Sequence, residues 1–322
     1  MIAHLSTPCE DHLTVSLVKS GFTFHLFDDI LPFGEFDTDI TPATDCLVPL
    51  MPAKYATELP SRLDFTIDAA KEAADFIMCH YLSPELAVER KRDASPVTAA
   101  DRGAEELLRR LIGVQYPEDG IFGEELEEKA GTSGWRWILD PIDGTKSFIH
   151  GVPLFGTLIG LEYDHRQVLG LCRFPALNEV VYAAEGLGAW WQISENHRRP
   201  ARTSDVKKID DAVFCTTTIQ GWRRVGQQAA FDKLCDAAAI SRGWGDCYGH
   251  ILVATGRADL MVDPLLNPWD CAALVPIMQE ASGHFVDFNG DVTIHSNNGL
   301  SVNGHLRDAT LELLQTPKNN PG

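Results

Sequence analysis

The sequence is short of basic residues. It has 27 Lys and Arg against 46 Asp and Glu, which gives a formal net charge of −19 over 322 residues. This charge disfavours unassisted binding to nucleic acid or to an anionic membrane, because both carry dense negative charge. A small anionic substrate remains compatible with it, provided that metal ions supply local positive charge. We therefore expect a small-molecule partner, with neither nucleic acid nor membrane.

Long apolar runs and paired cysteines are also missing. No apolar run reaches about 18 residues, the length of a membrane-spanning helix, so no span is expected. The N-terminus lacks a basic start followed by an apolar core, so no secretory signal is expected. The eight cysteines are scattered without a CxxC pair, which favours reduced thiols and a cytoplasmic protein.

The first 60 residues differ from the rest in composition and in hydrophobic periodicity. They hold six prolines, several acids and little periodicity, and are interpreted as an N-terminal extension of uncertain structure over residues 1–60. An alternative is that translation begins at Met51. From Leu63 to Tyr81 apolar residues recur at helical spacing, with Ser61 as the expected N-cap.

The remainder divides into two halves with different patterns. After a second helix over 99–112, strands are expected over 136–139, 154–162, 167–173 and 179–184, with another beyond a Gly-rich turn at 185–190. This predicts an α+β half over 61–198. Beyond it, strands over 212–216 and 258–262 alternate with helices over 227–238, 247–255 and 269–281, which predicts an α/β half over 199–322.

The segment WILDPIDGTKSF at 137–148 is the most informative in the chain. An apolar strand end runs into Asp140, Pro141, Asp143 and Gly144. Proline ends a strand ladder and glycine permits a sharp turn, so two carboxylates lie where a core strand opens into a loop. Carboxylates there suit a divalent cation better than a packed core.

Three further acidic positions have ordinary explanations when each is taken alone. Glu124, in GEE after an apolar pair, is typical of solvated surface. Asp270, in the NPWD segment, is a usual helix cap, and Asp101 suits a first helical turn. Together with Asp140 and Asp143 they match one chemistry, because two Mg²⁺ ions bound by carboxylates can clamp an in-line phosphoryl displacement.

GEE, then DPIDGT, then WD, in this order and spacing, resembles the signature of the inositol monophosphatase superfamily over residues 62–305. The resemblance implies a layered αβαβα sandwich of the sugar-phosphatase type, two or three Mg²⁺ per active site, and a homodimer. It implies these metal ligands: Glu124, Asp140, Ile142 through its carbonyl, Asp143 and Asp270. It also implies that Glu124, Thr145 and Asp101 act on the nucleophilic water, and that amides of Gly144 and Thr145 hold phosphate beside Asp143.

The second half resembles the histidinol-phosphatase branch of the superfamily. The resemblance lies in WGDCYG at 244–249 and PWDCAALVPI at 268–277. It implies hydrolysis of L-histidinol phosphate, with Trp244, Gly245, Asp246 and Asp263 near the substrate. Asp246 or Asp263 could pair with the substrate ammonium, and Trp244 could pack on its imidazole.

The same residues leave alternatives open. Asp246 could cap the helix that follows, Trp244 could be core, and Asp263 with Pro264 could form a turn. The substrate could instead be inositol phosphate, a sugar phosphate or a nucleotide 3′-phosphate. A non-catalytic phosphate-ligand binding protein with the same fold is a third hypothesis. His250 and His284 are given no role.

Overall fold

The computed structural model describes residues 53–84, 88–90, 96–194 and 197–315. The expected extension over 1–60 falls mostly outside these residues and stays a prediction, as does the division at residue 198. In the described part of the chain, no helix is both long and apolar enough to cross a membrane.

Two helices, α1 (Ala53–Met78) and α2 (Ala99–Gln115), pack together against one face of the first sheet. The prediction that the first helix starts at Ser61 was wrong, since Ser61 lies inside α1 with its hydroxyl 2.8 Å from the Glu58 carbonyl. The two extra turns form because Tyr55 is buried and stacks on Trp135 at 5.6 Å between ring centroids. The predicted cap of α2 is confirmed, because Thr98 and Asp101 form a capping box.

The first sheet has seven strands in the order β3-β4-β5-β6-β7-β8-β9. β3 and β4 are parallel, and every later neighbour is antiparallel. The bounds are β3 Gly120–Gly123, β4 Trp135–Asp143, β5 Gly156–Tyr163, β6 Arg166–Phe174, β7 Glu179–Ala184, β8 Gly188–Ser194 and β9 His197–Pro200. A short hairpin of β1 (Val88–Arg90) and β2 (Pro96–Thr98) precedes α2, and α3 (Thr145–Ile149) follows β4.

The second sheet has five strands in the order β11-β10-β12-β14-β13. Its strands are β10 Val213–Cys215, β11 Ile240–Arg242, β12 Leu260–Asp263, β13 Gly283–Val286 and β14 Gly299–Asn303. The helices of this half are α4 Ile219–Arg224, α5 Gln228–Ala237, α6 Asp246–Ala254, α7 Pro268–Cys271, α8 Leu274–Glu280 and α9 Arg307–Leu314, with a 3₁₀ turn at Ile209–Asp211. Another 3₁₀ turn, Pro175–Leu177, joins β6 to β7 in the first half. The expected alternation of strands and helices is present, but the helix expected over 269–281 is divided into α7 and α8, and β11, β13 and β14 were not predicted.

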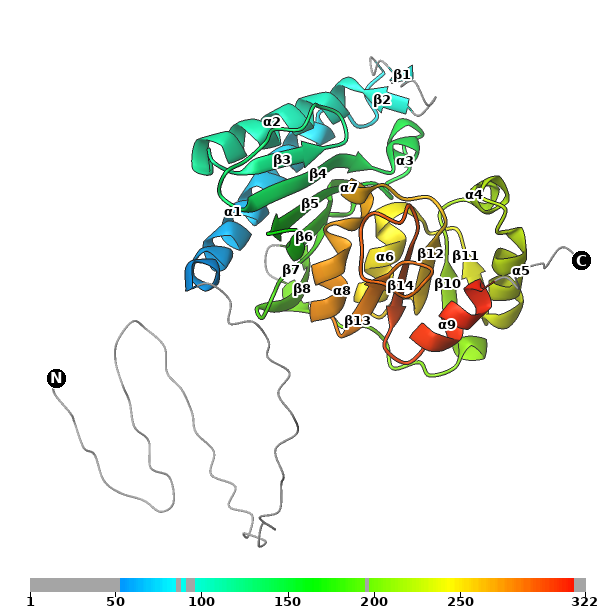
Figure 1. Ribbon diagram of the computed structural model, residues 1–322. Helices are drawn as coiled ribbons and strands as arrows, with labels where there is room; N and C mark the ends of the chain where they lie inside the picture. The colour runs from blue at the N-terminus through cyan, green and yellow to red at the C-terminus, as the bar shows by residue number, and fades with distance from the viewer. Residues whose placement is uncertain (1–52, 85–87, 91–95, 195–196, 316–322) are drawn as a thin grey trace, which may run out of the picture. The chain divides into compact units, whose positions relative to one another are not determined.

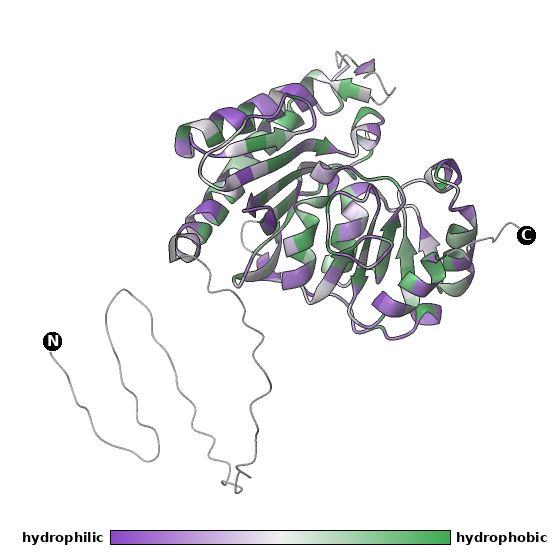
Figure 2. Ribbon diagram, in the orientation of Figure 1, coloured by the Kyte–Doolittle hydropathy of each residue, from purple (hydrophilic) through white to green (hydrophobic). Residues whose placement is uncertain are grey.

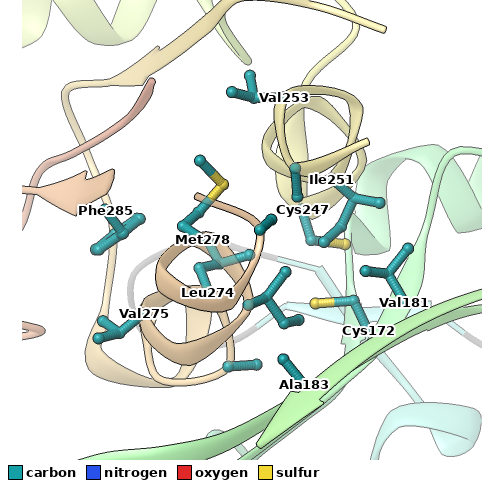
Figure 3. Packing of buried hydrophobic residues seen from close by; sticks show 14 of the residues in the cluster. Cys172, Val181, Ala183, Cys247, Ile251, Val253, Leu274, Val275, Met278 and Phe285 are labelled. Carbon is teal, nitrogen blue, oxygen red and sulfur yellow. The ribbon is translucent and has the colours of Figure 1, made fainter. Parts of the chain in front are cut away.

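The layers follow from three cores. One lies between α1, α2 and the seven-stranded sheet, and another between the five-stranded sheet and the outer helices α5 and α9. The largest fills the space between the sheets with residues of α6 and α8. Figure 3 shows Ile251 of α6 beside Val181 of β7, with Leu274 and Met278 on α8 in the same core. The strands are mostly hydrophobic, whereas helices show a polar outer side (Figure 2). This order of helix, sheet, helix, sheet and helix is the predicted αβαβα sandwich (Figure 1).

Candidate active site

A bulge in β4 places two carboxylates together. Asp140 pairs with Leu158 of β5 and Asp143 with Gly156, so β4 has one residue more than its partner between these pairs. In a regular strand residues three apart point to opposite faces, and the extra residue removes that alternation. The strand was expected to end at 139, and it continues because Pro141 lies in this bulge, where no ladder hydrogen bond is lost.

A third carboxylate reaches the same point from α7. Asp270 is the third residue of this one-turn helix, and its carboxylate accepts the Asn267 N–H at 2.7 Å. The N-cap is therefore Asn267, and Asp270 is its partner in a capping box rather than the cap itself. Trp269 packs on Phe122 of β3 at 5.5 Å, which fixes α7 beside β4. Asp140, Asp143 and Asp270 then offer carboxylate oxygens within 4.8 Å of one another. The aspartates that the sequence separates by 127 residues therefore converge (270 minus 143).

The cluster is electrostatically strained without a cation. Burial raises the pKa of Asp140, and repulsion from Glu124, Asp143 and Asp270 raises that pKa further. Burial likewise raises the pKa of Asp270 to about 7, with Glu124 adding to the shift. Several acidic oxygens that repel one another in a buried site are the donor set that a hard divalent cation stabilises. The residues present therefore fit a Mg²⁺ site.

Glu124 joins the cluster from the end of β3. Its backbone N–H donates to the Leu139 carbonyl at 3.1 Å, which continues the parallel pairing of β3 with β4. Its charge acts on both Asp140 and Asp270, although its carboxylate lies outside the tight group of three. The GEE motif thus borders the cluster, and the role of Glu124 as a metal ligand stays a prediction.

Thr145 and Asp101 meet beside the DGT turn. The Thr145 hydroxyl lies 3.0 Å from the Ile142 carbonyl and 3.3 Å from Asp101 Oδ1. The other Asp101 oxygen accepts the Thr98 N–H at 2.7 Å and the Thr98 hydroxyl at 2.6 Å. Asp101 therefore caps α2 with one oxygen and faces Thr145 with the other. Burial raises its pKa, and the Thr98 hydrogen bonds oppose that shift.

The turn itself requires glycine. Gly144 has φ +81°, in the left-handed region, and a Cβ there would come 3.0 Å from the Leu154 carbonyl oxygen. This conformation lets the chain reverse from β4 into α3, which begins at Thr145. The turn thereby keeps Asp143, Gly144 and Thr145 at the same corner of the sheet.

Residues of the second half close the site opposite this corner. Asp143, Asp246, Asp263 and Asp270 all line a cavity of about 70 Å³. Asp246 begins α6, and burial followed by repulsion from Asp263 raises its pKa to about 6, while Lys146 lowers it. The backbone N–H of Cys247 donates to Asp143 Oδ2 at 2.5 Å, which ties α6 to the DGT corner.

The remaining predicted residues lie around α6. Gly245 is the residue before the helix, and only glycine fits because a Cβ would come 2.4 Å from the Thr217 Cα. Trp244 is 41% exposed, and the Arg242 guanidinium lies 6.0 Å from its ring centroid. Trp244 is therefore not core, and it is not among the residues that line the 70 Å³ cavity.

Comparison with known proteins agrees with this geometry. A profile described as the inositol monophosphatase family matches residues 58–318. The chain belongs to this family. A histidinol-phosphatase of Chlorobaculum parvum is 42% identical over 238 residues, which cover 74% of this chain and 90% of that protein.

Other similar proteins are named for different activities. A fructose-1,6-bisphosphatase/inositol-1-monophosphatase of Thermotoga maritima is 30% identical over 79% of this chain and 95% of its own length. The crystal structure of the extragenic suppressor protein suhB from Bartonella henselae matches with a TM-score of 0.74 and 28% identity, covering 80% of this chain and 99% of that one. As an inositol monophosphatase family member, the chain is a phosphatase, a hydrolase of phosphomonoesters.

The structure adds two residues to the site: Thr217, which was not predicted from the sequence, and His250, which was given no role. Thr217 follows β10 and bonds both Asp263 and Asp246. His250 lines the cavity from the second turn of α6. Each had a signal, because Thr217 directly follows a predicted strand and His250 stands four residues after Asp246, on the same helical face.

Proposed function

We propose that the protein is a Mg²⁺-dependent phosphatase that hydrolyses L-histidinol phosphate to L-histidinol and phosphate. The observation that carries the proposal is the cavity in which Asp246 and Asp263 lie beside Asp143 and Asp270. The cluster of Asp140, Asp143 and Asp270 already suffices to attract a cation. The carboxylates of Asp246 and Asp263 would therefore give a negative charge to the alcohol side of the pocket, which is the part that faces the alcohol group of the substrate. An alcohol that bears an ammonium group matches that charge.

The metal would be held by Glu124, Asp140, Asp143, Asp270 and the Ile142 carbonyl. When bound, Mg²⁺ lowers the pKa of a water, neutralises the carboxylates and offsets charge that develops on the leaving oxygen. The resemblance to the family supports two or three ions. Clustered carboxylates with raised pKa values support at least one.

The protein's own groups would orient the attacking water and the phosphate. With its hydroxyl donating to Asp101, Thr145 leaves its oxygen lone pairs to accept a proton of the water. Glu124 would accept the water's other proton. The amides of Gly144 and Thr145, at the turn beside Asp143, would donate to the phosphate oxygens.

Asp246 is the proposed partner of the substrate ammonium. Both Asp263 oxygens accept hydrogen bonds from Thr217, at 2.8 Å and 2.6 Å, whereas Asp246 stands at the start of α6 against the DGT corner. Asp263 would contribute its charge from the same cavity, and Trp244 at the rim would pack on the imidazole. The 42% identity to a histidinol-phosphatase supports this choice of alcohol.

A panel of phosphate esters with and without Mg²⁺ tests the proposal. The wild type should hydrolyse histidinol phosphate with a higher kcat/KM than inositol 1-phosphate, a nucleotide 3′-phosphate or 2-glycerophosphate, and each reaction should need Mg²⁺. Preference for another ester would favour the alternative that the relative from Thermotoga maritima represents. Tight binding without turnover would favour the non-catalytic phosphate-ligand binding protein.

The variant Asp246→Asn sharpens this test because it removes charge with little change of shape. Loss of one charged hydrogen bond should raise KM for histidinol phosphate by about 10-fold or more relative to KM for 2-glycerophosphate. Asp236→Asn, at an exposed position on α5, is the matched control. An equal effect of Asp246→Asn on both esters would remove Asp246 from substrate recognition.

The expected cytoplasmic location and the expected homodimer stay predictions. The similarity to structures of the family concerns the fold of one chain. Size-exclusion chromatography with light scattering would measure the oligomeric state directly.

A further inference from the structure

A histidine is buried beneath the alcohol side of the cavity. His250 is 1% exposed, and its Nδ1 lies 2.8 Å from the Ser301 hydroxyl of β14. His250 lines the cavity. Its Nε2 lies 3.5 Å from Asp263 Oδ2, which is too far for a good hydrogen bond. Among the described residues, Nε2 has no hydrogen-bond partner. A buried polar atom of this kind is costly unless a partner reaches it.

The groups around His250 determine which of its ring nitrogens carries the proton. When the Ser301 hydroxyl donates to Nδ1, the ring proton of neutral histidine resides on Nε2. That N–H then faces the Asp263 carboxylate, which is the favourable electrostatic arrangement. The ring packs against Phe285 at 5.8 Å, so it is held in this orientation from the other side as well.

Asp263 is linked to Asp246 by hydrogen bonds through Thr217. Its Oδ1 accepts the Thr217 N–H at 2.8 Å and its Oδ2 accepts the Thr217 hydroxyl at 2.6 Å. The same hydroxyl oxygen accepts the Asp246 N–H at 2.7 Å. Asp246 needs this support because its φ of +52° is in the left-handed region. Thr217 therefore holds the Asp263 carboxylate and the Asp246 backbone through one hydroxyl group.

The cavity consequently presents two kinds of hydrogen-bonding group side by side. The carboxylates of Asp246 and Asp263 accept, and the Nε2–H of His250 donates. Polyols and ammonium groups satisfy the acceptors. An alcohol that carries a cationic nitrogen together with a nearby acceptor atom satisfies both kinds.

We propose that His250 is a specificity-determining residue whose Nε2–H donates to an acceptor atom of the substrate alcohol, while Asp246 and Asp263 take its cationic nitrogen. This inference rests on the proposed function and deepens it, since it names the chemical class: phosphoesters of alcohols that bear a cationic nitrogen beside a hydrogen-bond acceptor. Ser301 and Thr217 act as positioning residues, the first for the ring and the second for the Asp263 carboxylate and the Asp246 backbone.

Two variants separate recognition from packing. His250→Asn keeps an amide near the Nδ1 position, facing Ser301, and lacks any group at the Nε2 position. His250→Gln extends its amide to the Nε2 position. His165→Asn is the matched control, because that side chain is 92% exposed in the hairpin between β5 and β6.

The measurement is KM and kcat of the full chain with Mg²⁺, for histidinol phosphate and for 4-nitrophenyl phosphate. His250→Asn should raise the ratio of the two KM values about 10-fold, as expected for one lost hydrogen bond, and His250→Gln should recover most of it. A purely structural role would move both KM values together and lower the melting temperature of both variants alike. That result, or an unaltered KM ratio in His250→Asn, would overturn the inference.

Failure of the proposed function has a different signature. In that case the wild type itself would not hydrolyse histidinol phosphate. The same variants are then compared on the ester that the wild type hydrolyses best, again against 4-nitrophenyl phosphate. If the KM ratio still stays the same in His250→Asn, the inference about His250 fails independently.

Discussion

At the scale of single residues, the site is a set of acids that are unstable together without a cation. Burial raises the pKa of Asp143, and repulsion from Asp246 and Asp270 raises it further. Asp270 has a pKa of about 7 and Asp246 of about 6 for the same reasons. Each raised pKa means that the folded protein without metal binds protons that the unfolded chain releases at lower pH.

This predicts how stability depends on pH. Without metal, the stabilisation from these protonated acids is complete below about pH 4, the unfolded pKa of an aspartate, and is lost as pH rises through about 7. Added Mg²⁺ competes with those protons. We expect Mg²⁺ to raise the melting temperature more at about pH 8 than at about pH 5.5, by at least about 3 °C.

The check is differential scanning calorimetry of protein stripped with a chelator, with and without Mg²⁺, at both pH values. Addition of Na⁺ at equal ionic strength controls for general screening. If the shift with Mg²⁺ were the same at both pH values, the raised pKa values would have no bearing on metal binding.

At the scale of secondary-structure elements, the position of Asp270 depends on how closely α7 and α8 approach the seven-stranded sheet. A Cβ at Gly170 of β6 would come 1.9 Å from the Ala273 carbonyl oxygen, and a Cβ at Gly160 of β5 would come 2.7 Å from the Ala272 Cβ. Only glycine permits this contact. The junction between α7 and α8 can therefore lie on the strands, with Asp270 beside Asp140.

Gly170→Ala should consequently lower both stability and activity. Overpacking of this kind costs about 1–3 kcal/mol in the free energy of unfolding, because α8 has to move away from β6. Urea unfolding measures the cost, and kcat with saturating Mg²⁺ measures the displacement of Asp270. Gly113→Ala is the matched control: nothing lies within 4 Å of its Cβ position in α2, so it should stabilise by up to about 1 kcal/mol. Equal unfolding midpoints for the two variants would contradict the packing argument.

The elements also show what could be predicted from sequence. The helix cap at Thr98 and the expected strands depend on local pattern, and the structure has the cap where it was expected and strands near the expected ranges. The strands β3, β11, β13 and β14 were not predicted. The bulge at Pro141 and the first two turns of α1 were missed. Both depend on distant partners, Asp143 on Gly156 of β5 and Tyr55 on Trp135 of β4.

In the candidate site, too, some residues follow from local sequence motifs and others depend on partners that are distant in the chain. Asp140, Asp143 and Asp270 were predicted from motifs, and the structure brings them together. Thr217 was missed because β10 and β12 are parallel neighbours, so their ends meet at one edge and place Thr217 beside Asp263, a pairing that no local pattern reveals. His250 was given no role because the orientation of its ring depends on Ser301, which lies far along the chain.

At the scale of the whole molecule, the two sheets supply different parts of one phosphatase. The seven-stranded sheet carries Glu124, Asp140 and Asp143, and the five-stranded sheet carries Asp263 with the loops around it. Cys172 of β6 and Cys247 of α6 lie side by side in the core that joins them (Figure 3). In the proposed function, the two halves would hold metal and alcohol at a fixed separation, which positions a substrate for in-line displacement.

The most direct test of this account is the anomalous diffraction of crystals grown with Mn²⁺ in place of Mg²⁺, for the wild type and for Asp143→Asn. We expect anomalous density in contact with the carboxylates of Asp140, Asp143 and Asp270 in the wild type, and loss or weakening of it in the variant. Anomalous density found only away from these three carboxylates, under conditions in which the crystallised protein hydrolyses phosphate esters, would contradict the account.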